Sequence, residues 1–106
     1  MELNLNDVSV THNEEAHQFE ATVNGLRAFL TYRQTPERMI LPHTEVPGPL
    51  EGHGLAEKLT RAALDFARAH HLLVVPFCPY VADFLRKHSE HQDLLSAGDL
   101  QKILSS

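Results

Sequence analysis

The sequence predicts a single domain of the α+β or α/β class, built on a mixed sheet with short helices at the end of the chain. Three observations lead to this prediction. Apolar and polar residues alternate through much of residues 8–46, which is typical of half-buried strands. From residue 54 the apolar positions recur with the period of an amphipathic helix. A continuous apolar run then follows at 72–77, which is typical of a strand buried on both faces.

The first half of the chain is expected to form antiparallel strands at residues 8–10, 17–23, 26–32 and 38–46. Asn24 and Gly25 separate the second strand from the third, and this pair favours the positive φ angles of a type I′ hairpin turn. Pro42 lies inside the fourth strand. Because proline has no N–H group to donate, pairing there must be interrupted or one edge left open.

The second half is expected to contain three helices and one strand. The apolar stripe of the first helix comprises Leu55, Leu59, Ala62, Ala63, Phe66 and Ala67. Since this helix separates two strands, the strands at 38–46 and 72–77 should be parallel. Pro79 suits the first position of a second helix, and Asp99 could cap a short third helix.

Composition limits the possible functions. Residues 1–106 leave room for only one domain. The net charge of −5 argues against binding the nucleic-acid backbone and mildly favours a cationic partner such as an amine. No apolar run has bilayer length, and the first residues lack the features of a signal peptide. With a single cysteine, the sequence therefore predicts a cytoplasmic protein without a membrane span or a disulfide.

The eight histidines raise the question of a metal site. Zinc needs three or four ligands that converge on one point, and the sequence contains neither the HExxH nor the CxxC spacing. Surface or helix-end histidines are the commoner interpretation, so we expect no metal.

The stretch "EGHGLAEKL" (51–59) places two glycines at the start of the first helix. The lysine and hydroxyl of a Walker loop are missing, and no third glycine completes a dinucleotide-binding motif. What remains is a helix N-terminus with free amide groups, beside glycines that allow a ligand to approach closely. Such a terminus can hold a pyrophosphate. The alternative is an ordinary strand-to-helix turn.

The order and spacing of several motifs resemble the GCN5-related (GNAT) N-acetyltransferases, and in particular their small single-domain branch with a cysteine near the acetyl-CoA site. The matching segments are "HTEVP" (43–47), "EGHGLAEKL" (51–59), "ALDFAR" (63–68), "VVPFCPYV" (74–81) and "RKH" (86–88). The resemblance covers roughly residues 17–91, which is most of the chain.

The resemblance implies a site for acetyl-CoA, that is, for coenzyme A with its acetyl group. In such folds the strands on either side of the helix splay apart, and the pantetheine arm lies between them. The amides of His53 to Ala56 would hold the pyrophosphate. The expected cofactor-binding residues are His43, Thr44, Glu45, Val46, Gly52, His53, Gly54, Leu55, Ala56, Cys78 and Tyr80.

Cys78 is the second unusual residue, because it ends a predicted strand immediately before a helix that starts with proline. Helix amides stabilise a thiolate, although a free cysteine is more often a small buried hydrophobe. Two mechanisms stay open. In direct transfer, Glu45 takes the proton of the amine and Tyr80 or Cys78 returns one to the thiolate of CoA. In the other mechanism Cys78 is acetylated first. Glu45 could also be a solvated strand residue, and His43 an alternative base.

We therefore expect an enzyme, an acetyl-CoA-dependent N-acetyltransferase acting on an amine acceptor. Only a few residues (14–16) connect the first two strands, so the acceptor site should be open. An open site favours a protein lysine, a protein N-terminus or a polyamine. The alternative is a non-catalytic module that binds CoA or acyl-CoA.

Overall fold

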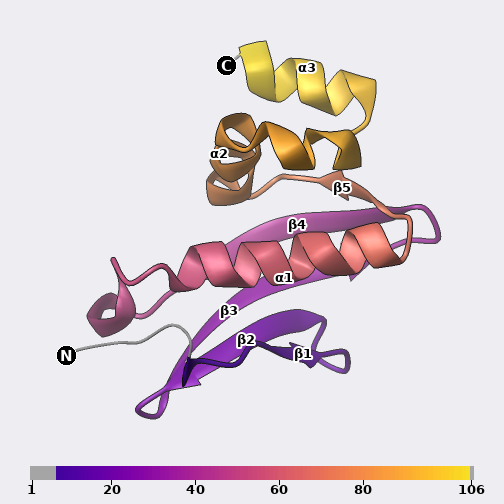
Figure 1. Ribbon diagram of the computed structural model, residues 1–106. Coiled ribbons are helices and arrows are strands. Elements are labelled where there is room, and N and C mark those ends of the chain that lie inside the picture. The colour runs from indigo at the N-terminus through magenta and orange to yellow at the C-terminus, as the bar shows by residue number, and fades with distance from the viewer. Residues whose placement is uncertain (1–6, 106) are drawn as a thin grey trace.

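The computed structural model describes residues 7–105, in which five strands form one mixed sheet in sequence order (Figure 1). The first four pair antiparallel, and β5 pairs parallel with β4. The predicted fold class is confirmed. The strands are β1 (Thr11–Asn13), β2 (Gln18–Val23), β3 (Leu26–Gln34), β4 (Arg38–Glu45) and β5 (Leu73–Val75). The helices are α1 (Leu55–Ala69), α2 (Pro79–Lys87) and α3 (Ala97–Ser105), with 3-10 segments η2 (Gly48–Leu50) and η3 (Ser89–Leu94).

The hairpin between β2 and β3 turns at Asn24 and Gly25, whose φ angles of 51° and 78° confirm the predicted turn. The first strand was placed too early in the sequence. Val8 is buried in the core, but the ladder with β2 begins only at Thr11. An apolar residue can therefore pack under the sheet without belonging to it. Residues 14–17 form a turn between β1 and β2 and contain no helix.

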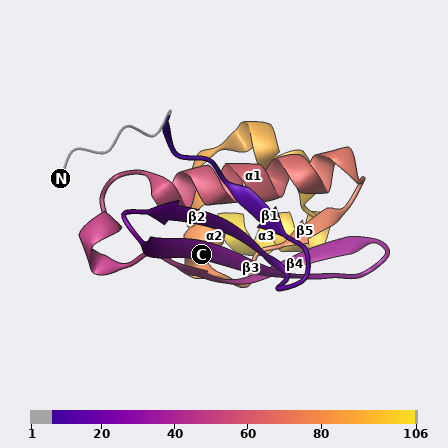
Figure 2. The ribbon, with the colours of Figure 1, turned by 90° about the horizontal axis from the view of Figure 1, so that it is seen from below.

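α1 packs along one face of β2, β3 and β4, as the view from below shows (Figure 2). On that face β3 contributes Ala28, Leu30 and Tyr32, which are all buried. The intervening residues of β3 point to the opposite face, because side chains alternate along a strand. That face carries half-buried and exposed residues, such as Thr31 and Arg33. The sheet thus has one covered and one open face.

β4 and β5 part after a short parallel ladder. Arg38 to Ile40 pair with Leu73 to Val75, and beyond them the Cys78 N–H donates to the Leu41 carbonyl at 2.8 Å. On its other side β4 shifts register against β3 between the pairs Thr31–His43 and Arg33–Ile40. The irregularity falls at Leu41 and Pro42, which confirms the predicted interruption of pairing at the proline.

Two predictions about the second half are wrong. The run 72–77 gives a strand of only three residues, and Phe77 beyond it is 70% exposed. In β5 only Val74 is buried, while Leu73 and Val75 on the other face are half buried, so the run is not fully covered on both faces. In α3 the cap is Ser96, whose hydroxyl accepts the Asp99 N–H at 3.2 Å. Asp99 lies within the first turn of the helix.

No helix within residues 7–105 has the length and apolar character needed to cross a membrane. The same residues contain no cluster of three or more histidine, cysteine or acidic side chains that could hold a metal ion.

Candidate functional site

The loop before α1 leaves the first amides of the helix open. Gly52 and Gly54 have φ angles of 80° and 84°, in the left-handed region that favours glycine. Gly54 is the N-cap residue, and no side chain caps the helix there. The first intrahelical bond runs from the Lys58 N–H to the Gly54 carbonyl at 3.1 Å. The preceding amides, from Leu55 on, therefore have no partner within the helix, as at any helix N-terminus.

A cavity of about 240 Å³ lies beside this loop. It brings together six of the residues expected to bind a cofactor, namely Val46, Gly52, Gly54, Leu55, Ala56 and Tyr80. Leu50 and Glu51 also line it and were missed. Leu50 is fully buried in the short η2 segment, and no motif in the sequence marks it. His53 is half buried and does not line the cavity.

Cys78 lies at the closed end of the gap between β4 and β5. It is only 5% exposed, and it is the N-cap residue of α2. Its Sγ donates to the hydroxyl of Thr44 at 3.5 Å. Thr44 pairs with Leu30, so both side chains point to the face that α1 covers. The structure thus brings Cys78 and Thr44 together on the α1 side of the sheet.

His43 and Glu45 lie on the other side of the sheet. They pair with Thr31 and Phe29, whose side chains point to the open face. His43 Nε2 and Glu45 Oε1 are 3.6 Å apart, and both side chains are more than half exposed. The structure therefore does not gather all the predicted catalytic residues on one side. Glu45 is separated from Cys78 by the strand that carries it.

Tyr80 projects beside the cavity from the first turn of α2 and is 41% exposed. Burial raises the pKa of its phenol, and the nearby carboxylates of Glu57 and Asp83 raise it further. A raised pKa keeps the phenol protonated at neutral pH, so Tyr80 can donate a hydrogen bond at the cavity.

An alkaline titration should detect this environment. Tyr32 and Tyr80 are the two tyrosines of a chain without tryptophan, and burial is the first cause of a raised pKa for both. Their contribution to stability is fully present below about pH 10, the ordinary tyrosine value, and is lost as the pH rises through the folded values. We expect phenolate absorbance to appear above about pH 10, together with a falling free energy of unfolding. A phenolate midpoint at or below the ordinary value would contradict this.

Together these features define the class of small α+β domains in which a glycine-flanked helix N-terminus opens beside two parting parallel strands. A family model described as GCN5-related N-acetyl-transferase matches residues 18–94. The chain belongs to this family, and the resemblance seen in its motifs is confirmed.

Three relatives show how far the similarity extends, each called Protein NATD1. The protein of Bos taurus is 36% identical over 84 residues, which cover 76% of this chain and 74% of the relative. The protein of Mus musculus is 34% identical over 84 residues, 76% of each chain. The protein of Danio rerio is 31% identical over 100 residues, which cover 88% of this chain and 91% of the relative.

Proposed function

We propose that this chain is an acetyl-CoA-dependent N-acetyltransferase that acts on an amine. The observation that carries the proposal is that three features lie next to one another at the end of β4. These are the open amides of α1, the cavity next to them, and the edge of β4 beyond Leu41, which β5 leaves unpaired. Membership of the family supports the same interpretation.

The residues on the α1 side fit coenzyme A. Helix amides next to glycines in the left-handed region can hold a pyrophosphate without a cationic side chain. From this loop the cavity extends to Val46 and Tyr80, and the unpaired edge of β4 continues to Thr44. This edge offers backbone groups to the amides of the pantetheine arm, in the way that an edge strand accepts a further strand.

The two faces of the sheet divide the work of transfer. When bound, acetyl-CoA would supply an activated acetyl group near Thr44 and Cys78. Glu45, on the open face beside His43, would accept the proton of the incoming amine through water, because the strand separates it from Cys78. Tyr80 on the opposite side, at the cavity beside the glycine loop, would give a proton to the departing thiolate.

The acceptor is proposed to be an exposed amine, such as a protein lysine, a protein N-terminus or a polyamine. Only a turn at residues 14–17 joins β1 to β2, and the open face of the sheet around His43 carries no helix among residues 7–105. The net charge of −5 favours a cationic acceptor. The single cysteine suits a cytoplasmic location, which we propose as well.

Native mass spectrometry with acetyl-CoA, in the presence and absence of spermidine or a lysine peptide, tests the proposal. We expect a one-to-one complex with the coenzyme and one acetyl group added to an acceptor. A complex without transfer to any amine would indicate the binding module instead. Absence of a complex would contradict both.

The same experiment tests the role of Cys78. Its sulfur is buried and hydrogen-bonded to the hydroxyl of Thr44. This arrangement favours a role in packing and positioning over nucleophilic attack on a thioester. We expect no acetyl adduct on the protein, and Cys78→Ala should keep substantial turnover. An acetyl group on Cys78 that forms as fast as turnover would overturn direct transfer and establish the two-step mechanism.

A further inference from the structure

A second cavity lies at the other end of α1, about 20 Å from the glycine loop if α1 rises as a regular helix. Its volume is about 390 Å³. Its lining includes five rings and one carboxylate, from His12, Glu14, His17, Tyr32, Phe66 and His70. These residues come from β1, the β1–β2 turn, β3 and α1. We call this space the ring cavity.

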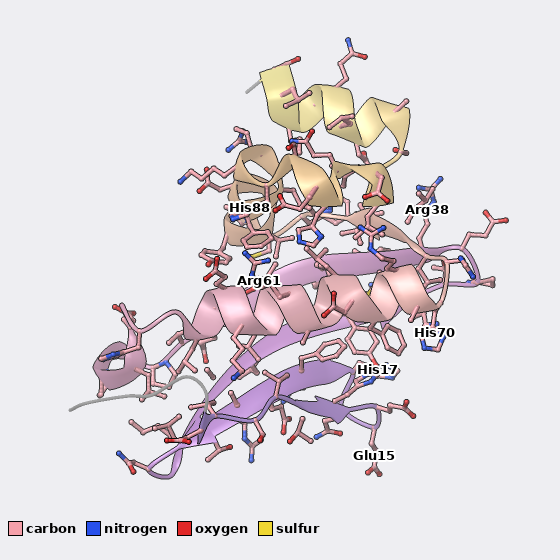
Figure 3. All side chains as sticks on the ribbon, viewed as in Figure 1. Glu15, His17, Arg38, Arg61, His70 and His88 are labelled. Atoms are coloured by element: carbon pink, nitrogen blue, oxygen red, sulfur yellow. The ribbon has the colours of Figure 1, made fainter. Side chains whose placement is uncertain are left out.

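The rings form one connected cluster. The ring centroids of His12 and Phe66 are 4.8 Å apart, and those of Phe66 and His70 are 4.1 Å apart. The rings of His17 and Tyr32 are nearly perpendicular, with centroids 5.8 Å apart. Below them the buried Phe19 stacks on His12 at 4.3 Å. Figure 3 shows His17 and His70 on the same side of the molecule, near the end of α1.

With its three histidines neutral, the ring cavity carries a negative charge. Within residues 7–105, Glu14 is the only carboxylate that lines it, and no lysine or arginine does. Arg33 lines a neighbouring hollow that shares His17 and Tyr32. The Glu14 carboxylate is 80% exposed and lies 3.9 Å from His12 Nδ1, and after burial it is the second cause of the raised pKa of Tyr32. His12 Nε2 in turn lies 2.6 Å from the Tyr32 hydroxyl, which fixes both rings.

His17 is held in a costly conformation. Its φ angle of 54° lies in the left-handed region, where a residue with a side chain is disfavoured by roughly 1–2 kcal/mol. The Glu14 carbonyl accepts the His17 N–H, and the His17 carbonyl accepts the Tyr32 N–H at 2.9 Å. The tight turn thus brings the carboxylate and the imidazole to the same rim of the cavity.

We propose that the ring cavity binds an alkylammonium group, either the primary ammonium of a lysine or polyamine or a methylated one. Of the lining rings, Phe66 and Tyr32 attract such a cation through their quadrupole. The Glu14 carboxylate adds a Coulomb attraction. The cavity is large enough for a small ammonium group with its alkyl stem. This site goes beyond the proposed transferase activity, since it uses none of the residues around the glycine loop.

The test compares choline with 3,3-dimethylbutan-1-ol, which has the same shape but no charge. NMR titration of the full chain without coenzyme, at about pH 8 so that ordinary imidazoles are neutral, should show choline binding at least about fivefold more tightly. The shifts should centre on His12, Phe66 and His70. Spermidine in a parallel titration distinguishes a primary ammonium from a methylated one. The proposal would be overturned if choline bound no better than the alcohol and spermidine did not bind either, or if the shifts centred elsewhere.

Two substitutions sharpen the test. Phe66→Leu keeps an apolar side chain but removes a ring face. It should lower the affinity for whichever ammonium ligand binds by about three- to tenfold. Glu14→Gln should weaken it similarly, whereas Glu15→Gln should not. The Glu15→Gln substitution makes the same change in net charge as Glu14→Gln. The Glu15 side chain, however, points away from the ring cavity (Figure 3). If both glutamate variants weaken binding equally, the attraction comes from net charge and the assigned site is wrong.

Discussion

Replacing Gly54 by valine is expected to abolish binding of coenzyme A while the chain stays folded. The φ angle of 84° disfavours any residue with a side chain, and a branched one most of all. Valine would shift the loop and occupy space where a pyrophosphate must approach the amides. Since hydrogen bonds to a charged group contribute about 1.5–3 kcal/mol each, losing two of them should lower affinity at least about 100-fold. Calorimetry measures the change.

Gly25→Val is the matched control for this experiment. Gly25 has a φ angle of 78°, so valine meets the same backbone conflict there, but in the β2–β3 hairpin. Both variants should lose roughly 1–2 kcal/mol of stability, as thermal melts followed by circular dichroism will show. Only Gly54→Val should lose the coenzyme. Undiminished affinity in a folded Gly54→Val protein would refute the pyrophosphate assignment.

The largest loss of stability is expected for Leu64→Ala in α1. Leu64 is fully buried, and its truncation removes apolar contacts and leaves a cavity. Such changes cost about 2–5 kcal/mol, a large part of the roughly 5–15 kcal/mol that hold a domain together. The melting temperature should fall by roughly 10 °C or more.

Asp65→Ala, one residue further along the same helix, is the control. Asp65 is exposed, and alanine suits a helix, so stability should change by less than about 0.5 kcal/mol. Urea denaturation of both variants gives the free energies directly. If the two variants had the same free energy of unfolding, Leu64 would not be part of the core.

Local patterns were sufficient to predict most of the fold. Each local pattern fits one type of element. Alternation predicted β2 and β3, the Asn24-Gly25 pair predicted their turn, and the apolar stripe predicted α1. The prediction was wrong for β5, because a short apolar run does not reveal how many of its residues will be paired or covered. Phe77 is as apolar as Val74, yet the first is 70% exposed and the second is buried.

The candidate site was predictable where backbone conformation is tied to residue type. Gly52 and Gly54 take φ angles that only glycine adopts easily, and Pro79 begins α2 as its geometry favours. The sequence did not predict on which face of the sheet the side chains at the end of β4 lie. The bulge at Leu41 and Pro42 shifts the register, and this places Thr44 towards Cys78 and Glu45 on the open face. The ring cavity was also missed, because its residues are far apart in the sequence.

The strand order of the sheet has a consequence for how the chain folds. β1 to β4 follow each other in space as they do in sequence, so each pairing closes only a short loop and loses little chain entropy. The pairing of β4 with β5 is different, because the chain between them contains all of α1 and the loop is long. Only three residue pairs stabilise this long-range contact. Topology therefore implies that the meander forms early and the β4–α1–β5 crossover late. The glycine loop belongs to that late closure, and so a nascent chain would acquire the proposed coenzyme site in the last step of folding.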